Sequence, residues 1–192
     1  MGKLVVTEFI TLDGVMEDPG GGETFDRGGW AFQFERGEEG DKFKLDETLQ
    51  AEALLLGRVT YEGFAAVWPT ITDEAGFADK MNTMPKHVVS STLQELTWNN
   101  SSRIEGDVAD GVAKLKEQKD GEILVAGSAT LVQTLVDHDL VDELRLMVYP
   151  VVLGDGKRLF GDTASTKSFR LVESRPMGDD GVVVMRYEPV KP

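Results

Sequence analysis

The stretch Ala53-Leu54-Leu55-Leu56-Gly57-Arg58-Val59-Thr60-Tyr61 decides the fold. It opens on an uninterrupted apolar run, which is typical of a strand buried on both faces of a parallel sheet. The run stops at Gly57, and a helix is predicted over residues 58–66. Such a turn presents free backbone N–H groups and the positive end of a helix dipole. With Arg58 and Thr60 beside it, the turn favours phosphate binding, although a solvated Arg58 at an ordinary turn is an equal alternative.

Two further apolar runs end in the same way. Lys86-His87-Val88-Val89-Ser90-Ser91-Thr92 finishes in three hydroxyl residues, and Glu122-Ile123-Leu124-Val125-Ala126-Gly127-Ser128-Ala129-Thr130 finishes in a glycine turn. An apolar helical face over residues 131–136 follows the second run, with Ser128 as its natural N-cap. Parallel strands end at one edge of a sheet, where open α/β sheets bind ligands. The three turns together predict a site for an extended nucleotide with several phosphates.

Composition narrows the possible functions. The chain has 192 residues, which suits one domain over residues 1–192, and its net charge of −14 argues against nucleic acid or anionic membrane as a partner. The absence of cysteine removes disulfides, thiol nucleophiles and Cys-ligated zinc, and the two histidines do not form a metal motif. We expect no metal. With neither a signal peptide nor a long apolar run, a cytoplasmic protein is expected.

The order of the predicted elements indicates an α/β protein whose front half is β/α and whose tail is antiparallel. Residues 17–40 are rich in glycine, acids and aromatics, and we interpret them as an ordered loop that covers a pocket or packs against a second subunit. Predicted helices span residues 41–51, 58–66 and 74–81, with two more after Asp107 and Ser128. The predicted strands span residues 4–10, 53–56, 88–89, 98–104, 122–126, 143–149, 169–173 and 182–187, the last two as a hairpin.

In order and spacing, these features resemble the dihydrofolate reductase-like superfamily. The resemblance is closest to stand-alone relatives of the C-terminal reductase domain of the bifunctional riboflavin-biosynthesis deaminase-reductase, and it covers essentially the whole chain. It implies a three-layer α/β/α sandwich with a mostly parallel central sheet and antiparallel C-terminal strands. The matching segments are Thr11-Leu12-Asp13-Gly14, Leu56-Gly57-Arg58-Val59-Thr60-Tyr61, Val89-Ser90-Ser91-Thr92, Val125-Ala126-Gly127-Ser128-Ala129 and Pro150-Val151-Val152-Leu153-Gly154-Asp155-Gly156.

The resemblance implies an NADPH-dependent reductase with a small-molecule substrate and a homodimer formed through the C-terminal strands. The first turn would hold cofactor phosphates, the second would contact the adenosine end with its 2′-phosphate, and the third would let the pyrophosphate and nicotinamide approach the backbone. The implied cofactor-binding residues are Gly57, Arg58, Thr60, Ser90, Ser91, Thr92, Gly127, Ser128 and Ala129.

Candidate groups for the substrate and the proton lie outside these turns. Asp13 ends the first strand beside the expected nicotinamide and is our candidate for proton delivery and substrate contact, with a simple Asx-turn as the alternative. Trp30 would close the substrate pocket, or else pack in the core or against a second subunit. Arg158, next to Lys157, would suit a phosphorylated substrate, or else belong to a solvated loop.

Three functions compete. The first is hydride transfer from NADPH to a small heterocyclic or carbonyl substrate. The second is reduction of 5-amino-6-(5-phosphoribosylamino)uracil in riboflavin biosynthesis. The third is a non-catalytic nucleotide-binding or sensing protein. Dihydrofolate reductases hold the pterin with a helix carboxylate; Asp46 and Glu47 lie on the corresponding helix, but no motif marks either, so activity on folate is not expected.

Overall fold

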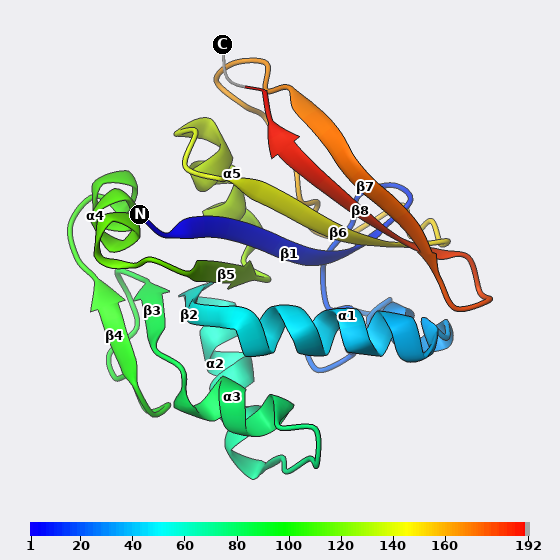
Figure 1. Ribbon diagram of the computed structural model, residues 1–192, viewed down its shortest axis with the longest axis horizontal. Helices are drawn as coiled ribbons and strands as arrows, with labels where there is room; N and C mark the ends of the chain where they lie inside the picture. The colour runs from blue at the N-terminus through cyan, green and yellow to red at the C-terminus, as the bar shows by residue number, and fades with distance from the viewer. Residues whose placement is uncertain (191–192) are drawn as a thin grey trace.

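The structure is a computed structural model that describes residues 1–190, and one eight-stranded sheet runs through it (Figure 1). The sheet order is β4-β3-β2-β5-β1-β6-β8-β7. The six strands from β4 to β6 are parallel, whereas β8 and β7 are antiparallel, as expected. The strands are β1 (Lys3–Thr11), β2 (Ala51–Gly57), β3 (Lys86–Val89), β4 (Ser101–Ile104), β5 (Glu122–Ala126), β6 (Glu143–Tyr149), β7 (Phe169–Met177) and β8 (Val182–Pro189).

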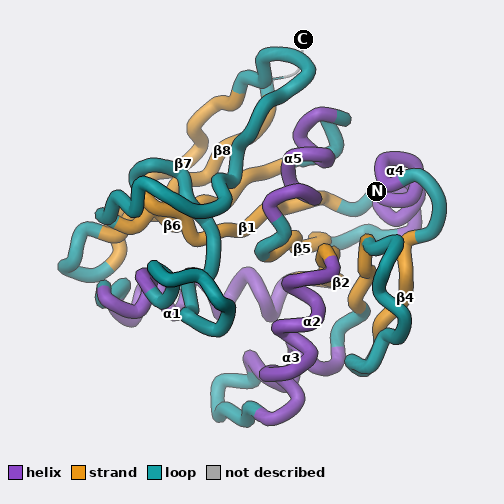
Figure 2. The backbone as a smooth tube through the Cα atoms, turned by 180° about the vertical axis from the view of Figure 1, so that it is seen from behind, coloured by secondary structure: helices purple, strands orange, loops and turns teal. Residues whose placement is uncertain are grey.

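Helices cover both faces of this sheet, which makes the predicted three-layer α/β/α sandwich (Figure 2). One face carries α1, α2 and α3, and the other carries α4 and α5. Among residues 1–190, no helix is long and apolar enough to cross a membrane. The helices are α1 (Gly37–Gln50), α2 (Arg58–Val67), α3 (Phe77–Thr83), α4 (Val108–Gln118) and α5 (Ala129–Asp137), with 3-10 turns η1 (Trp30–Gln33) and η2 (Trp68–Thr70).

The core follows from the alternation of side chains along the strands. In β1, Leu4, Val6 and Ile10 pack toward α4 and α5, whereas Val5 and Phe9 pack on the opposite face. The apolar run of β2 does the same, because its leucines enter the clusters on both sides of the sheet. The prediction of a strand buried on both faces is confirmed.

The loop predicted over residues 17–40 is wrong at its C-terminal end, because α1 begins at Gly37 and not at Asp41. Glycines at 37 and 40 lower the helix propensity of this turn, but the acids Glu38 and Glu39 offset that cost by facing the positive helix end. In the remainder of the segment, Trp30 and Phe34 pack against Tyr149 of β6.

Other boundaries also differ from the prediction. Strand β7 runs to Met177 instead of ending at residue 173, and β3 begins at Lys86 instead of residue 88. Helix α3 starts at Phe77 instead of residue 74, because the carboxylate of Asp73 accepts the N–H groups of Phe77 and Ala78 and so fixes a turn before the helix. Strand β4 starts at Ser101 instead of residue 98. Trp98 is buried against α2 and α3, with its N–H bonded to the Tyr61 hydroxyl, and does not pair in the sheet.

A buried charge cluster ties the parallel part of the sheet to the antiparallel part. Arg145 of β6 pairs directly with Arg186 of β8, an arrangement of like charges that is unfavourable alone. Glu143, whose side chain is 1% exposed, compensates by accepting from Nε of both arginines at 2.7 Å, and it also bonds Lys3. Arg145 Nη2 further bonds Glu122 at 2.6 Å. Glu143 is therefore the acceptor that makes the pairing of β6 with β8 possible.

Strand β7 is the outermost strand on the antiparallel side. Its residues Leu171 and Val172 are 49% and 46% exposed, and no strand within residues 1–190 pairs with its outer edge. The homodimer expected through the C-terminal strands stays a prediction.

We predict that Glu143→Gln destabilises the protein at neutral pH and makes its stability less dependent on pH in acid. Burial raises the pKa of Glu143, but the bonds from Arg186, Arg145 and Lys3 outweigh it and lower the pKa from 4.5 to about 2. This stabilisation is present above pH 4.5 and is lost as the pH falls through about 2. At pH 7 the variant should lose about 3–5 kcal/mol in chemical unfolding, because two buried guanidinium groups lose a charged acceptor. Its stability should also fall less steeply below pH 4.5.

Glu188→Gln is the matched control, because Glu188 pairs with Arg170 on the exposed surface of the same hairpin. It should cost less than about 1 kcal/mol. Equal losses in the two variants would contradict the role given to Glu143.

Candidate functional site

The strand register brings the three predicted turns to one level at the carboxyl edge of the sheet. Gly57 of β2 pairs with Val89 of β3, and Leu55 of β2 pairs with Val125 of β5. The turns that begin at Gly57, Ser90 and Gly127 therefore leave adjacent strands side by side, at the strand spacing of about 4.8 Å. The predicted convergence of the three strand ends is confirmed.

Two of these turns interlock through the hydroxyl of Ser128. Its Oγ accepts the N–H of Gly57 at 2.8 Å and donates to the Thr60 hydroxyl at 3.0 Å. The expectation that this side chain caps α5 is wrong: Ser128 occupies the N-cap position with φ 70°, and its hydroxyl makes no cap bond. Normal capping needs an extended backbone, so here the hydroxyl braces the start of α2 instead.

The interlock leaves no space for a side chain at Gly127. Its φ is +66°, and an added Cβ would lie 2.6 Å from the Thr60 hydroxyl oxygen. At Gly57 an added Cβ would lie 3.0 Å from Ser128 Oγ. Contact between the turns therefore requires glycine at 127 and leaves little space for a side chain at 57, and the bare backbone of both residues forms the surface at this edge.

The N-terminal ends of α2 and α5 reach this edge without a capping side chain. Their first N–H groups thus remain available to an anion, and the helix dipoles favour one. This arrangement fits the phosphates of a dinucleotide. Arg58 is 44% exposed on α2 and pairs with Glu62 at 2.8 Å, one helical turn further on. Its guanidinium lies at the surface beside the turn, within a single i,i+4 ion pair.

The turn after β3 is held by the hydroxyl of its first residue, Ser90. Ser90 Oγ accepts the N–H groups of Thr92 and Leu93 at 3.2 and 2.9 Å. Ser91 and Thr92 are exposed. Arg103 donates to the carbonyls of Ser90 and Leu93, which fixes this turn from the neighbouring strand β4.

Asp13 clamps a second loop to the end of β1. Its carboxylate accepts the Thr11 hydroxyl at 2.6 Å and the N–H groups of Leu153 and Gly154 at 3.2 and 2.8 Å. These bonds, the one from Thr11 foremost, lower the pKa of Asp13 to about 2. The group is therefore ionised at neutral pH. The catalytic role of Asp13 stays a prediction, and its contacts define it as the anchor of the loop over residues 150–158.

The other two residues that were predicted to contact the substrate are Arg158 and Trp30. Arg158 is half-exposed and donates from Nε to the Asp13 carbonyl at 3.1 Å, so it belongs to the same clamp. Trp30 is 1% exposed and packs edge-on against Tyr149, with its indole N–H bonded to the Glu17 carbonyl. Trp30 was expected to close the substrate pocket, to pack in the core or to pack against a second subunit. The structure places it in the core of its own chain.

Two buried acids near the end of β1 were not selected from the sequence. Glu47 of α1 accepts from the Thr7 hydroxyl at 2.8 Å and from Lys44, whose ammonium lies 5.1 Å from the ring centre of Phe9. Glu8 faces the opposite side and accepts the Gly127 N–H at 3.0 Å. Asp46, the other helix acid considered, is exposed and pairs with Lys42.

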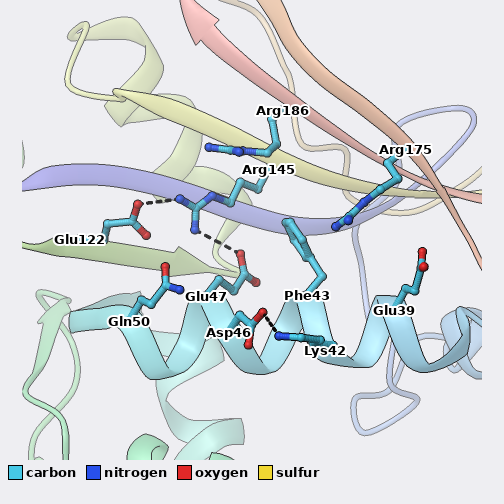
Figure 3. Close-up of a pocket in the computed structure, with 10 residues that line it drawn as sticks. All are labelled: Glu39, Lys42, Phe43, Asp46, Glu47, Gln50, Glu122, Arg145, Arg175 and Arg186. Carbon is cyan, nitrogen blue, oxygen red and sulfur yellow. Dashed lines mark hydrogen bonds and ion pairs between the residues drawn. The ribbon is translucent and has the colours of Figure 1, made fainter.

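A cavity of about 420 Å³ lies between α1 and the strands β6, β8 and β7 (Figure 3). Four acidic and four basic side chains line it together with Phe43 and Gln50, and several of them already pair, such as Arg145 with Glu122. Glu122 opens β5, but Arg145 lies level with Ala126, because both residues pair with Thr7 of β1. The lining of the cavity therefore extends along the sheet from the start of β5 toward the Gly127 turn.

Comparison with known proteins defines the class. The structure of dihydrofolate reductase from Enterococcus faecalis, complexed with NADP(H), is similar with a TM-score of 0.63 and 14% identity over 99% of this chain and 98% of that one. A protein described under riboflavin biosynthesis from Shewanella sp. PV-4 is similar with a TM-score of 0.77 and 21% identity, over 98% and 99% of the two chains. The fold is that of the dihydrofolate reductase-like class.

The family follows from the sequence match. Residues 2–183 match the family described as the RibD C-terminal domain, and the chain belongs to this family. It is also 29% identical over 188 residues to a Bacillus subtilis (strain 168) protein described as the uncharacterized protein YyaP, which covers 96% of this chain and 94% of the relative. The expected resemblance is confirmed.

We predict that Gly127→Ala destabilises the protein by about 1–3 kcal/mol, because the new methyl group meets the Thr60 hydroxyl and the φ is left-handed. Gly63→Ala is the matched control: this residue is inside α2 with nothing within 4 Å of an added Cβ, so it should stabilise by about 0.5–1 kcal/mol. Urea unfolding followed by circular dichroism measures both. A Gly127→Ala protein as stable as the wild type would refute the interlock.

We also predict that Asp13→Ala frees the loop it anchors. Hydrogen exchange at the Leu153 and Gly154 amides should accelerate about tenfold to a hundredfold, because two bonds to a charged acceptor are lost. Asp155→Ala is the control on the same loop, because Asp155 bonds only the neighbouring Gly156 N–H. Unchanged exchange in Asp13→Ala would show that the clamp does not order the loop.

Proposed function

We propose that the protein is an NADPH-dependent reductase that transfers hydride to a small heterocyclic or carbonyl substrate. The observation that carries this proposal is the pair of interlocked glycine turns at the carboxyl edge, with the uncapped ends of α2 and α5 beside them. Membership of the RibD C-terminal domain family and the dihydrofolate reductase-like fold support it.

The cofactor would lie across the three turns. Bound NADPH would supply the hydride. The backbone of Gly57 and Gly127 would receive the pyrophosphate, because only bare backbone at these positions permits close approach. Arg58 would leave Glu62 to meet the 2′-phosphate, together with hydroxyls from the turn that begins at Ser90, since Gly57 and Val89 pair directly.

The substrate would lie near the C-terminal end of β1, where Asp13 anchors the loop over residues 150–158. Because Asp13 is ionised at neutral pH, it would orient this loop or a water molecule and would not itself serve as a reservoir of protons. Arg158 lies at the same loop and would contact a phosphorylated substrate such as 5-amino-6-(5-phosphoribosylamino)uracil. That second candidate activity rests on this single cation.

The test is the affinity for NADPH and NADH in the wild type and in Arg58→Ala, measured by calorimetry. Loss of one charged contact to phosphate should weaken NADPH binding about tenfold to a hundredfold and leave NADH binding nearly unchanged. Glu62→Gln should bind NADPH more tightly, because it releases Arg58 from its ion pair.

Arg170→Ala is the matched control, since Arg170 of β7 makes a similar exposed pair with Glu188 of β8, at the far side of the sheet. It should leave both affinities unchanged. If the wild type binds neither cofactor, the reductase proposal fails, and a nucleotide-binding protein for another ligand becomes the better reading of the same turns.

A further inference from the structure

Glu8 is a carboxylic acid buried inside the sheet beside the Gly127 turn. Thr7 of β1 pairs with Ala126 of β5, which places Glu8 level with Gly127. Glu8 is 5% exposed, and its Oε2 accepts the Gly127 N–H at 3.0 Å. Among residues 1–190 this is the only hydrogen bond of the Glu8 side chain, and the proposed function makes no use of it.

The immediate surroundings of Glu8 offer little to balance a charge. Oε1 is buried and has no hydrogen-bond partner among residues 1–190. The neighbours of Glu8 on the same face of β1 are Val6 and Ile10, and Leu146 of β6 pairs with it. An ionised carboxylate with a bare, buried oxygen is far more costly here than the uncharged acid.

The nearest charged groups do not remove this cost. Lys44 and Glu47 of α1 influence Glu8 in opposite directions and already bond each other. Helix α5, which covers this face, carries a charged side chain only at its far end, Asp137, and Arg58 on α2 is paired with Glu62. Burial is the largest effect and raises the pKa of Glu8 well above 4.5, against the opposing bond from Gly127.

We propose that Glu8 is a positioning residue for the cofactor turn: its uncharged carboxyl group fixes the Gly127 N–H, and its ionisation weakens dinucleotide binding there. The identity of the ligand rests on the proposed function, whereas the role of Glu8 in holding the Gly127 turn does not. It assigns to a residue of β1 control over a segment that begins more than a hundred residues later.

The turn needs such support because its backbone is strained. Gly127 and Ser128 both have left-handed φ, +66° and 70°, and Ser128 carries a side chain that disfavours this conformation. The bond to Glu8 fixes the first of these residues and the hydroxyl of Ser128 fixes the second. Without Glu8, the Gly127 N–H loses its acceptor and the turn can rotate away from the edge.

Ionisation of Glu8 acts through charge. The N-terminal end of α5 begins directly after Ser128, and its positive dipole end favours one anion. A carboxylate beneath the turn would occupy that favourable potential and repel the phosphates of a dinucleotide. The uncharged acid keeps the hydrogen bond and avoids the repulsion.

The first experiment uses the ligand-free protein at pH 7. Exchange of the Gly127 amide, followed by NMR, should accelerate at least tenfold in Glu8→Ala and stay within about threefold of the wild type in Glu8→Gln, whose amide oxygen still accepts the N–H. Glu52→Gln is the matched control, because Glu52 accepts a glycine N–H, that of Gly121, at the other end of β5. Equal Gly127 protection in Glu8→Ala would overturn the inference.

The second experiment measures the NADPH dissociation constant of the wild type and of Glu8→Gln as the pH is raised from about 5 to about 10. Burial raises the pKa of Glu8, so wild-type binding should weaken about tenfold as Glu8 ionises within this range, whereas Glu8→Gln should change less than about threefold and Glu52→Gln should follow the wild type. Identical pH profiles in wild type and Glu8→Gln would overturn the inference while leaving the reductase proposal intact. Absence of NADPH binding at every pH would overturn the proposed function, and exchange of the Gly127 amide would then test the role of Glu8 by itself.

Discussion

The hydroxyl of Ser128 is the contact on which the candidate site depends. By accepting from Gly57 and donating to Thr60, it joins the turn after β5 to the first turn of α2. An added Cβ would lie 2.6 Å from the Thr60 hydroxyl at Gly127 and 3.0 Å from the Ser128 hydroxyl at Gly57, so Gly127 cannot carry a side chain and Gly57 has little space for one. The surface that results is lined with N–H groups, and its chemistry follows from packing between turns more than from any single side chain.

On the α1 face of the sheet, charged side chains take the place that glycines have at the carboxyl edge. Arg145 lies among Glu47, Glu122 and Glu143, and two of these carboxylates belong to strands on either side of β1. Such a cluster can be buried only when every member is paired, so it fixes the relative position of the parallel and antiparallel parts. Ion pairs between side chains thus hold this part of the sheet, whereas backbone contacts and hydroxyl bonds hold the turns at its carboxyl edge.

Much of this could be predicted from local sequence. The apolar run before Gly57, its two counterparts and the alternation over residues 143–149 were enough to place most strands and the edge where they meet. Local sequence could not predict hydrogen bonds between residues that are far apart in the chain. Glu8 lies in an otherwise apolar strand with nothing nearby to mark it, because the N–H it holds is that of Gly127. Ser128 was misread for the same reason: the cap was predicted from its neighbours, whereas its hydroxyl serves a different helix.

The position of β1 in the sheet has a consequence for the chain during its synthesis, before it is folded. β1 lies inside the sheet between β5 and β6, yet Lys3 pairs with Glu122 and Val5 with Glu143. At a synthesis rate of about 5–20 residues per second, β1 is synthesised several seconds before either β5 or β6, the two strands that pair with it. Such distant pairing also slows folding itself, since long loops must close before their contacts are gained. The strand that carries Glu8 is therefore the one whose apolar surface stays unprotected longest, and nascent chains should be most prone to aggregation through it.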